Sequence, residues 1–241
     1  QQPGGTAIIV AGGRDSAPKW AEVDIVTNFV YQTLTALGFP SDRIRFLHPS
    51  YTADHPTYSG SSTSDNLTAA LSYIAANKVD ITSTIAPFNT PLTIVLTDSE
   101  ANSSDSIHLA NSATTGVVSG ASLSTIIDSY SAAITARYSG LAYPAPSYVP
   151  INIVLEADYS SSLITGLAAS GRTIFASANG GVSGVGLSGI GSYTYQFFDA
   201  IGDGSDLLTA HSDTSSYISS LYAAQTPAVE ADGDGNTDRA T

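Results

Sequence analysis

The chain has 241 residues, of which 42% are hydrophobic and only 12% are charged, a composition typical of a globular protein with a sizeable core. Its formal net charge of −13, from 21 acidic and 8 basic residues, repels phosphate backbones and argues against a nucleic-acid partner. The absence of cysteine excludes disulfides, thiolate metal sites and a cysteine nucleophile.

The first half of the chain predicts strands that alternate with helices. A continuous apolar run at 6–11 suits a strand that is buried on both faces. Apolar residues at spacings of three and four predict a helix from Trp20 to Leu37, with Gly38 as its C-cap. The next elements are predicted in chain order: a strand at 43–48, a helix capped by Ser64 or Asp65, and a strand at 91–98.

The second half continues the alternation after a segment rich in Ser, Asn and Gly at 99–121, in which 107–109 predicts a small ribbon. The remaining predicted elements are a helix through 123–134, strands at 151–156 and 172–177, a short helix at 162–169, and helices from Tyr195 and Leu207. Such alternation predicts a mostly parallel sheet with helices on both faces, which is a three-layer α/β/α architecture. In such sheets ligands bind beyond the carboxyl ends of the strands.

Two of the predicted strands end in acidic residues. The run at 91–98 is followed by Ser99 and Glu100, and the run at 150–158 ends in Glu156-Ala-Asp158. These segments resemble the legumain-like branch of the caspase-fold cysteine peptidases. In that family one strand ends in Asp-His-Gly and a later strand ends in Glu-Ala-Cys-x-Ser-Gly. The resemblance runs over nearly the whole chain, from the opening strand at 7–13 to the closing segments at 225–227 and 232–236.

The resemblance implies a caspase-like domain at 1–224 whose catalytic dyad has been replaced, followed by an acidic, Gly-rich tail at 225–241. It places the catalytic His at Ser99 and the nucleophilic Cys at Asp158. Glu100 and Ser161 stand at two nearby positions where the family has glycine. The change at Ser161 argues against an oxyanion site formed by backbone N–H groups there. It also implies that the former cleft is lined by a set of polar residues: Asp98, Glu100, Glu156 and Ser177.

These replacements predict a pseudopeptidase that serves as a binding or structural module, with a protein partner or by self-assembly. One alternative is an active hydrolase that reuses the cleft through carboxylates or a cryptic serine. Another is a subunit of an extracellular filament or surface layer. The four acids at the strand ends have three interpretations: a site for calcium or another hard cation, an acid pair for hydrolysis, or a solvated acidic rim.

Several features predict an extracellular location. The chain contains no methionine and starts at Gln1, so we expect a processed product from which a signal peptide was removed. Its low charge and its Ser, Thr and Tyr content suit a secreted or surface-associated protein. No apolar run approaches the ~20 residues that span a bilayer. We interpret glycosylation sequons at Asn66 and Asn102 as chance matches in a chain rich in Ser and Thr.

Three further motifs bear on binding or catalysis. Alternating oxygen ligands at Asp232, Asp234, Asn236 and Asp238 predict a partial calcium site, with a flexible acidic linker as the alternative. A GxGxxG match at 184–189 comes late in the chain, and we interpret it as a loop beside the cleft rather than a dinucleotide site. The four histidines show no ligand spacing, and no GxSxG elbow occurs: His48, His55, His108 and His211.

Overall fold

The computed structural model describes residues 5–100, 105–112, 115–179 and 189–238. Its centre is a six-stranded sheet in the order β2-β1-β3-β6-β7-β8, parallel except for the antiparallel pair β7–β8. The strands are β1 (Thr6–Gly12), β2 (Ile44–Leu47), β3 (Leu92–Asp98), β6 (Ile151–Glu156), β7 (Arg172–Ala176) and β8 (Ala228–Glu230). The predicted mostly parallel sheet is therefore confirmed.

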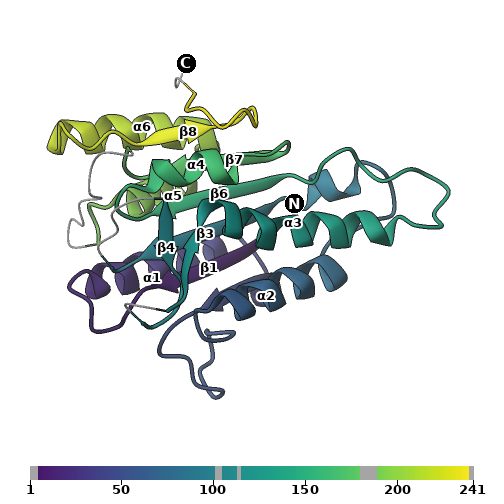
Figure 1. Ribbon diagram of the computed structural model, residues 1–241, viewed down its shortest axis with the longest axis horizontal. Coiled ribbons are helices and arrows are strands. Elements are labelled where there is room, and N and C mark those ends of the chain that lie inside the picture. The colour runs from purple at the N-terminus through teal and green to yellow at the C-terminus, as the bar shows by residue number, and fades with distance from the viewer. Residues whose placement is uncertain (1–4, 101–104, 113–114, 180–188, 239–241) are drawn as a thin grey trace.

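Helices cover both faces of this sheet, as Figure 1 shows. One face packs against α2 (Ser64–Asn77), α3 (Gly120–Arg137) and α4 (Ile164–Leu167), and the other against α1 (Trp20–Ala36), α5 (Tyr193–Gly202) and α6 (Leu207–Leu221). Short 3-10 turns complete the order: η1 (Ser41–Arg43), η2 (Ala86–Asn89) and η3 (Ser160–Leu163). The predicted three-layer α/β/α architecture is confirmed.

The central strands contribute to two separate cores because successive side chains of a strand point to opposite faces. Ile94 and Ile153 are buried in the core with α2 and α3, whereas Val95 and Val154 are buried in the core with α1 and α5. Full burial of each such side chain contributes roughly 1.5–3 kcal/mol relative to exposure. Burial on both faces explains why these strands are continuous apolar runs in the sequence.

A two-stranded antiparallel ribbon, β4 (Ser106–His108) with β5 (Val117–Ser119), lies at the carboxyl edge of the sheet. The backbone N–H of Gly13 donates to the carbonyl of His108 at 2.9 Å, which fixes the ribbon beside the end of β1. Ile107 and Leu109 are fully buried in the core with α2 and α3. The ribbon predicted at 107–109 is confirmed, and it brings His108 to the strand ends.

The structure corrects some expected boundaries. Helix α2 is capped by Thr63, not by Ser64 or Asp65, because the Thr63 hydroxyl accepts the N–H of Asn66 at 3.1 Å. Strand β8 lies within 225–241, where no regular element was predicted. With only three residues, it is too short to show the alternating pattern of a strand in the sequence.

Other expectations concern segments that the structure describes only in part. Of the GxGxxG segment, only Gly189 lies within the described residues. Asn102 lies outside them. Every helix in the described part of the chain is too short or too polar to cross a lipid bilayer.

Candidate functional site

The strands that carry the two predicted dyad positions are neighbours in the sheet. Strand β3 pairs with β6 in parallel, with Thr97 opposite Glu156. Ser99 and Asp158 each follow this pair by two residues, at the carboxyl edge. The loop between β1 and α1 passes over the same edge and supplies two cations, Arg14 and Lys19.

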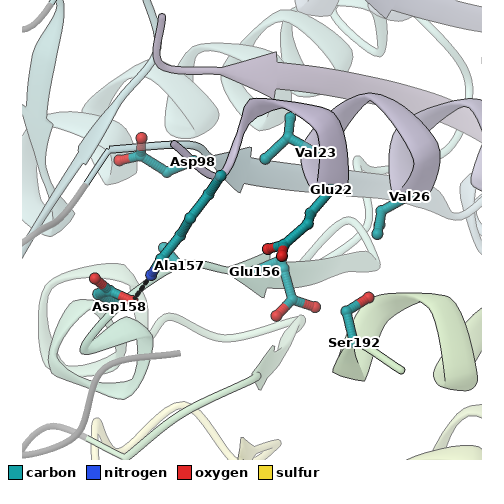
Figure 2. A pocket seen from close by; sticks show the side chains of 9 residues that line it. Glu22, Val23, Val26, Asp98, Glu156, Ala157, Asp158 and Ser192 are labelled. Atoms are coloured by element: carbon teal, nitrogen blue, oxygen red, sulfur yellow. Dashed lines mark hydrogen bonds and ion pairs between the residues drawn. The ribbon is translucent and has the colours of Figure 1, made fainter. Parts of the chain in front are cut away.

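Asp158, which the resemblance predicts at the position of the nucleophile, forms an ion pair with Lys19. Lys19 Nζ lies 2.5 Å from Asp158 Oδ1, and the dashed line in Figure 2 marks this contact. The Asp158 side chain is 3% exposed and the Lys19 side chain 30% exposed. A carboxylate this deeply buried requires a counter-charge, so the pair ties the end of β6 to the start of α1.

Asp98 holds the ribbon against β3. Its Oδ1 accepts the N–H of Glu100 at 2.8 Å, and its Oδ2 accepts the N–H of His108 at 2.7 Å. The Nδ1 atom of His108 lies 3.0 Å from the same Oδ2. The Asp98 side chain is completely buried, so these contacts replace the water that its carboxylate has lost. Sequence spacing gave no sign of the pair with His108, because its partners lie ten residues apart on different strands.

Glu100 and Ser99 are both bound to Arg14. The Arg14 guanidinium donates from Nε to Glu100 Oε1 at 2.5 Å and from Nη2 to Oε2 at 3.0 Å. This two-pronged hydrogen bond lowers the pKa of the Glu100 carboxyl below its usual value. The Ser99 hydroxyl donates to the Arg14 carbonyl at 2.9 Å. Both residues therefore fasten the loop after β3 to the loop after β1.

Glu156 stabilises the N-terminus of α5. Its Oε2 accepts the N–H of Thr194 at 2.6 Å, and the Ser192 hydroxyl accepts the N–H of Tyr195 at 3.3 Å as the N-cap. Burial raises the pKa of the Glu156 carboxyl, although the hydrogen bonds from Thr194 oppose this. Such a carboxylate satisfies free amides of the first helical turn and favours the helix dipole.

The turn after Asp158 also uses its polar groups internally. Tyr159 is the non-glycine residue with positive φ, at 55°, in the described part of the chain. The N–H of Ser161 donates to the carbonyl of Ala178 at 2.9 Å. The Ser160 and Ser177 hydroxyls lie 3.3 Å apart and are both completely buried. The N–H of Ser161, a position where the resemblance expects a glycine, is thus already bonded to the protein.

Little space remains between these groups. The pocket is lined by residues of α1, the ends of β3 and β6, and the start of α5: Lys19, Glu22, Val23, Val26, Asp98, Glu156, Ala157, Asp158 and Ser192 (Figure 2). The centres of water-sized molecules can occupy about 30 Å³ there, which is room for one or two waters.

The structure brings together some of the predicted cleft residues and separates others. Asp98, Glu156 and Asp158 line one pocket, whereas Glu100 and Ser177 are not among its lining residues. The acids do not form a solvated rim, because Asp98, Glu100 and Asp158 are each at most 8% exposed. Each is held by a different hydrogen-bond or ion-pair partner.

The acidic tail contains a second cluster. Carboxylate oxygens of Glu230, Asp232 and Asp238 all lie within 4.8 Å of one another. Two of the four predicted calcium ligands, Asp232 and Asp238, belong to this cluster. The other two, Asp234 and Asn236, bond to each other instead, with the Asn236 side-chain amide donating to Asp234 at 3.0 Å. Glu230 was missed because it precedes the motif, at the end of β8.

Comparison with known proteins identifies the fold. No model of a protein family matches this chain, and no curated protein sequence matches it. Among solved structures, the chain is similar to caspase-1 from Spodoptera frugiperda, with a TM-score of 0.55. The likeness covers 95% of this chain and 87% of that protein at 13% sequence identity. At such low identity it shows the fold alone, and the domain therefore has a caspase-like fold.

Proposed function

We propose that this caspase-fold domain is a pseudopeptidase that acts outside the cell as a binding or structural module. The observation that carries the proposal is the buried ion pair between Asp158 and Lys19 at the end of β6. By the legumain-like resemblance this is where a thiol nucleophile would stand. Here the position holds the carboxylate of Asp158, which forms an ion pair with Lys19 at the start of α1.

The neighbouring groups support the same conclusion. A cysteine peptidase requires a thiolate with an imidazole within hydrogen-bond reach, and this chain contains no cysteine. Ser99, at the resembling position of the imidazole, donates its hydroxyl to a backbone carbonyl. The N–H of Ser161 is bonded to Ala178. The groups that would carry the reaction therefore stabilise the loops instead.

The exposed apolar surface and the composition support the proposed role as a binding or structural module. At the opposite, amino end of the sheet, Ile85 is 66% exposed, and Phe88 and Tyr148 are 38% and 41% exposed with their rings in edge contact. Exposed apolar groups of this kind suit contact with a protein partner or with a second copy. The low charge and the Ser and Thr content support the extracellular location, and they also suit a filament or surface layer.

The proposal is tested with peptide substrates cleaved after Asn or Asp. We expect the purified chain to release no more product than buffer, and D98N and D158N variants to give the same background. Turnover by the wild type that D98N or D158N abolishes would show an active site at these strand ends and overturn the proposal. Sedimentation velocity over a range of concentrations then tests self-assembly.

One observation favours a second candidate, a hydrolase with a cryptic serine. The Asp98 carboxylate orients His108 through Nδ1, as the carboxylate of a catalytic triad orients its base. A fluorophosphonate probe that labels reactive serines separates the two functions by intact mass. The pseudopeptidase proposal expects no adduct. An adduct lost in H108Q but kept in the matched variant H55Q would support the hydrolase.

A further inference from the structure

We propose that Glu230, Asp232 and Asp238 bind one Ca²⁺ ion at the end of β8. This site is separate from the pocket at the ends of β3 and β6, and it does not depend on whether the domain is a peptidase. The chain leaves β8 at Glu230 and returns to pair Asp238 with Val229. The Asp238 N–H donates to the Val229 carbonyl at 2.7 Å, and the Ala231 N–H donates to Asp238 Oδ2 at 2.6 Å.

The spacing of the carboxylates fits a single ion. Calcium binds oxygen ligands at about 2.3–2.6 Å, so two oxygens on one ion are at most about 5 Å apart. The oxygens of Glu230, Asp232 and Asp238 meet this limit, since all lie within 4.8 Å of one another. They come from a strand end, a turn and the returning segment, so three separate parts of the loop contribute to the site.

Glu230 supplies independent evidence that a ligand belongs here. Its side chain is completely buried, and its Oε2 has no hydrogen-bond partner among the described residues. Its other oxygen, Oε1, accepts the N–H of Gly233. A buried carboxylate oxygen without a donor is costly, and most such atoms in proteins are satisfied by a donor, a water or an ion. The cluster places two further carboxylates, those of Asp232 and Asp238, beside the Glu230 carboxylate.

The charge of the cluster indicates a cation. Glu230, Asp232 and Asp238 take no part in the ion pairs found within the described residues. Glu230 is buried and lies beside the carboxylates of Asp232 and Asp238, so the three negative charges repel one another. A divalent ion bound among the three would offset both the burial and the repulsion.

The donor set selects calcium among the common metals. All three side chains offer carboxylate oxygen, which hard cations prefer, and none offers the imidazole or thiolate of typical zinc and copper sites. Magnesium requires near-ideal octahedral geometry and retains its waters, whereas calcium accepts irregular, flexible coordination. The turn is irregular, since Gly233 and Gly235 have φ of 87° and 84°, a region that favours glycine.

The site also touches the rest of the domain. The Thr165 hydroxyl on α4 donates to the Gly235 carbonyl at 3.2 Å, and a β-carbon on Gly233 would lie 3.1 Å from Ala169. The loop therefore packs against α4, which follows the turn after Asp158. Bound calcium would hold β8 and this loop in place and so stabilise the folded chain.

Calorimetric titration of the EDTA-treated full chain with CaCl₂ tests the proposal, with thermal unfolding as a second readout. We expect one ion per chain with Kd below about 1 mM, and a Tm that rises by about 5–10 °C near 100-fold excess over Kd. MgCl₂ should bind at least tenfold more weakly. Absence of binding at about 10 mM CaCl₂ would overturn the proposal.

Matched variants locate the ion. E230Q and D232N remove ligands, whereas D234N removes the same charge from the same loop outside the cluster. We expect at least a tenfold loss of affinity in the first two and less than a threefold change in D234N. Because Asp232 is exposed, D232N keeps the test valid even if E230Q fails to fold. Equal losses in D234N and D232N would show that general loop charge binds the ion and would refute the assignment.

Discussion

The acids at the carboxyl edge show that the role of a side chain depends on the partners that surround it. Asp98, Glu100, Glu156 and Asp158 sit where ligand-binding residues of a parallel sheet are found. Each is instead committed to a different element: the ribbon, the loop after β1, helix α5 and the start of α1. Buried charges are tolerated only when they are paired, and these pairings hold the connections above the sheet in place.

The pair between Lys19 and Asp158 gives a direct test at this scale. We expect K19M, which keeps most of the side-chain stem, to destabilise the chain by about 2–3 kcal/mol, because Asp158 remains buried without its counter-charge. Urea unfolding measures the loss. D158N should cost less, because the partly exposed Lys19 can turn toward water.

An exposed ion pair provides the control. Asp42 pairs with Lys78 at 2.5 Å, but its side chain is 61% exposed. D42N should leave the unfolding midpoint unchanged, since exposed pairs contribute little. If K19M were as stable as D42N, the pair at Asp158 would carry no structural role, and the central support for the pseudopeptidase proposal would be lost.

At the scale of elements, Glu156 connects β6 to the first turn of α5. E156A leaves the completely buried N–H of Thr194 without an acceptor, and we expect a loss of about 2 kcal/mol. E156Q keeps an oxygen that can accept this N–H, so it should lose about 1 kcal/mol or less. Chemical unfolding of both variants shows whether Glu156 stabilises the fold by accepting the Thr194 N–H or through its negative charge. Equal losses would contradict the capping role.

The sequence predicted the elements whose pattern repeats over enough residues. The apolar runs of β1, β3 and β6 and the helical spacing from Trp20 onward gave those elements within a residue or two. It did not predict β8, because only three residues pair and only Val229 and Glu230 among them are buried. The caspase-like arrangement came from the resemblance, and the structural likeness supports it.

The site was less predictable for a physical reason. The sequence shows which residues stand at the strand ends but not which side chains reach them from other elements. Arg14, Lys19 and His108 carry no motif, yet they decide what the neighbouring acids do. Glu230 likewise belongs to a strand, and only the return of Asp238 to Val229 places it in the acidic cluster.

At the scale of the whole molecule, the two helical layers bury polar groups whose titration affects folding. His211 on α6 is 2% exposed, lies beside Phe175 of the sheet, and contacts the Tyr193 hydroxyl at 2.6 Å and the Ser215 hydroxyl at 3.4 Å. Burial lowers the pKa of His211 from 6.5 to about 4. The neutral ring is therefore part of the packing between α6, α5 and the sheet.

This shift makes the fold sensitive to acid. Between pH 6.5 and 4 the unfolded chain binds a proton at His211 that the folded chain excludes, so stability is complete above pH 6.5 and falls toward pH 4. We expect wild type to lose on the order of 3 kcal/mol more than H211Q across this window. Urea unfolding at several pH values measures both slopes. Parallel slopes for wild type and H211Q would show that folding does not lower the pKa of His211.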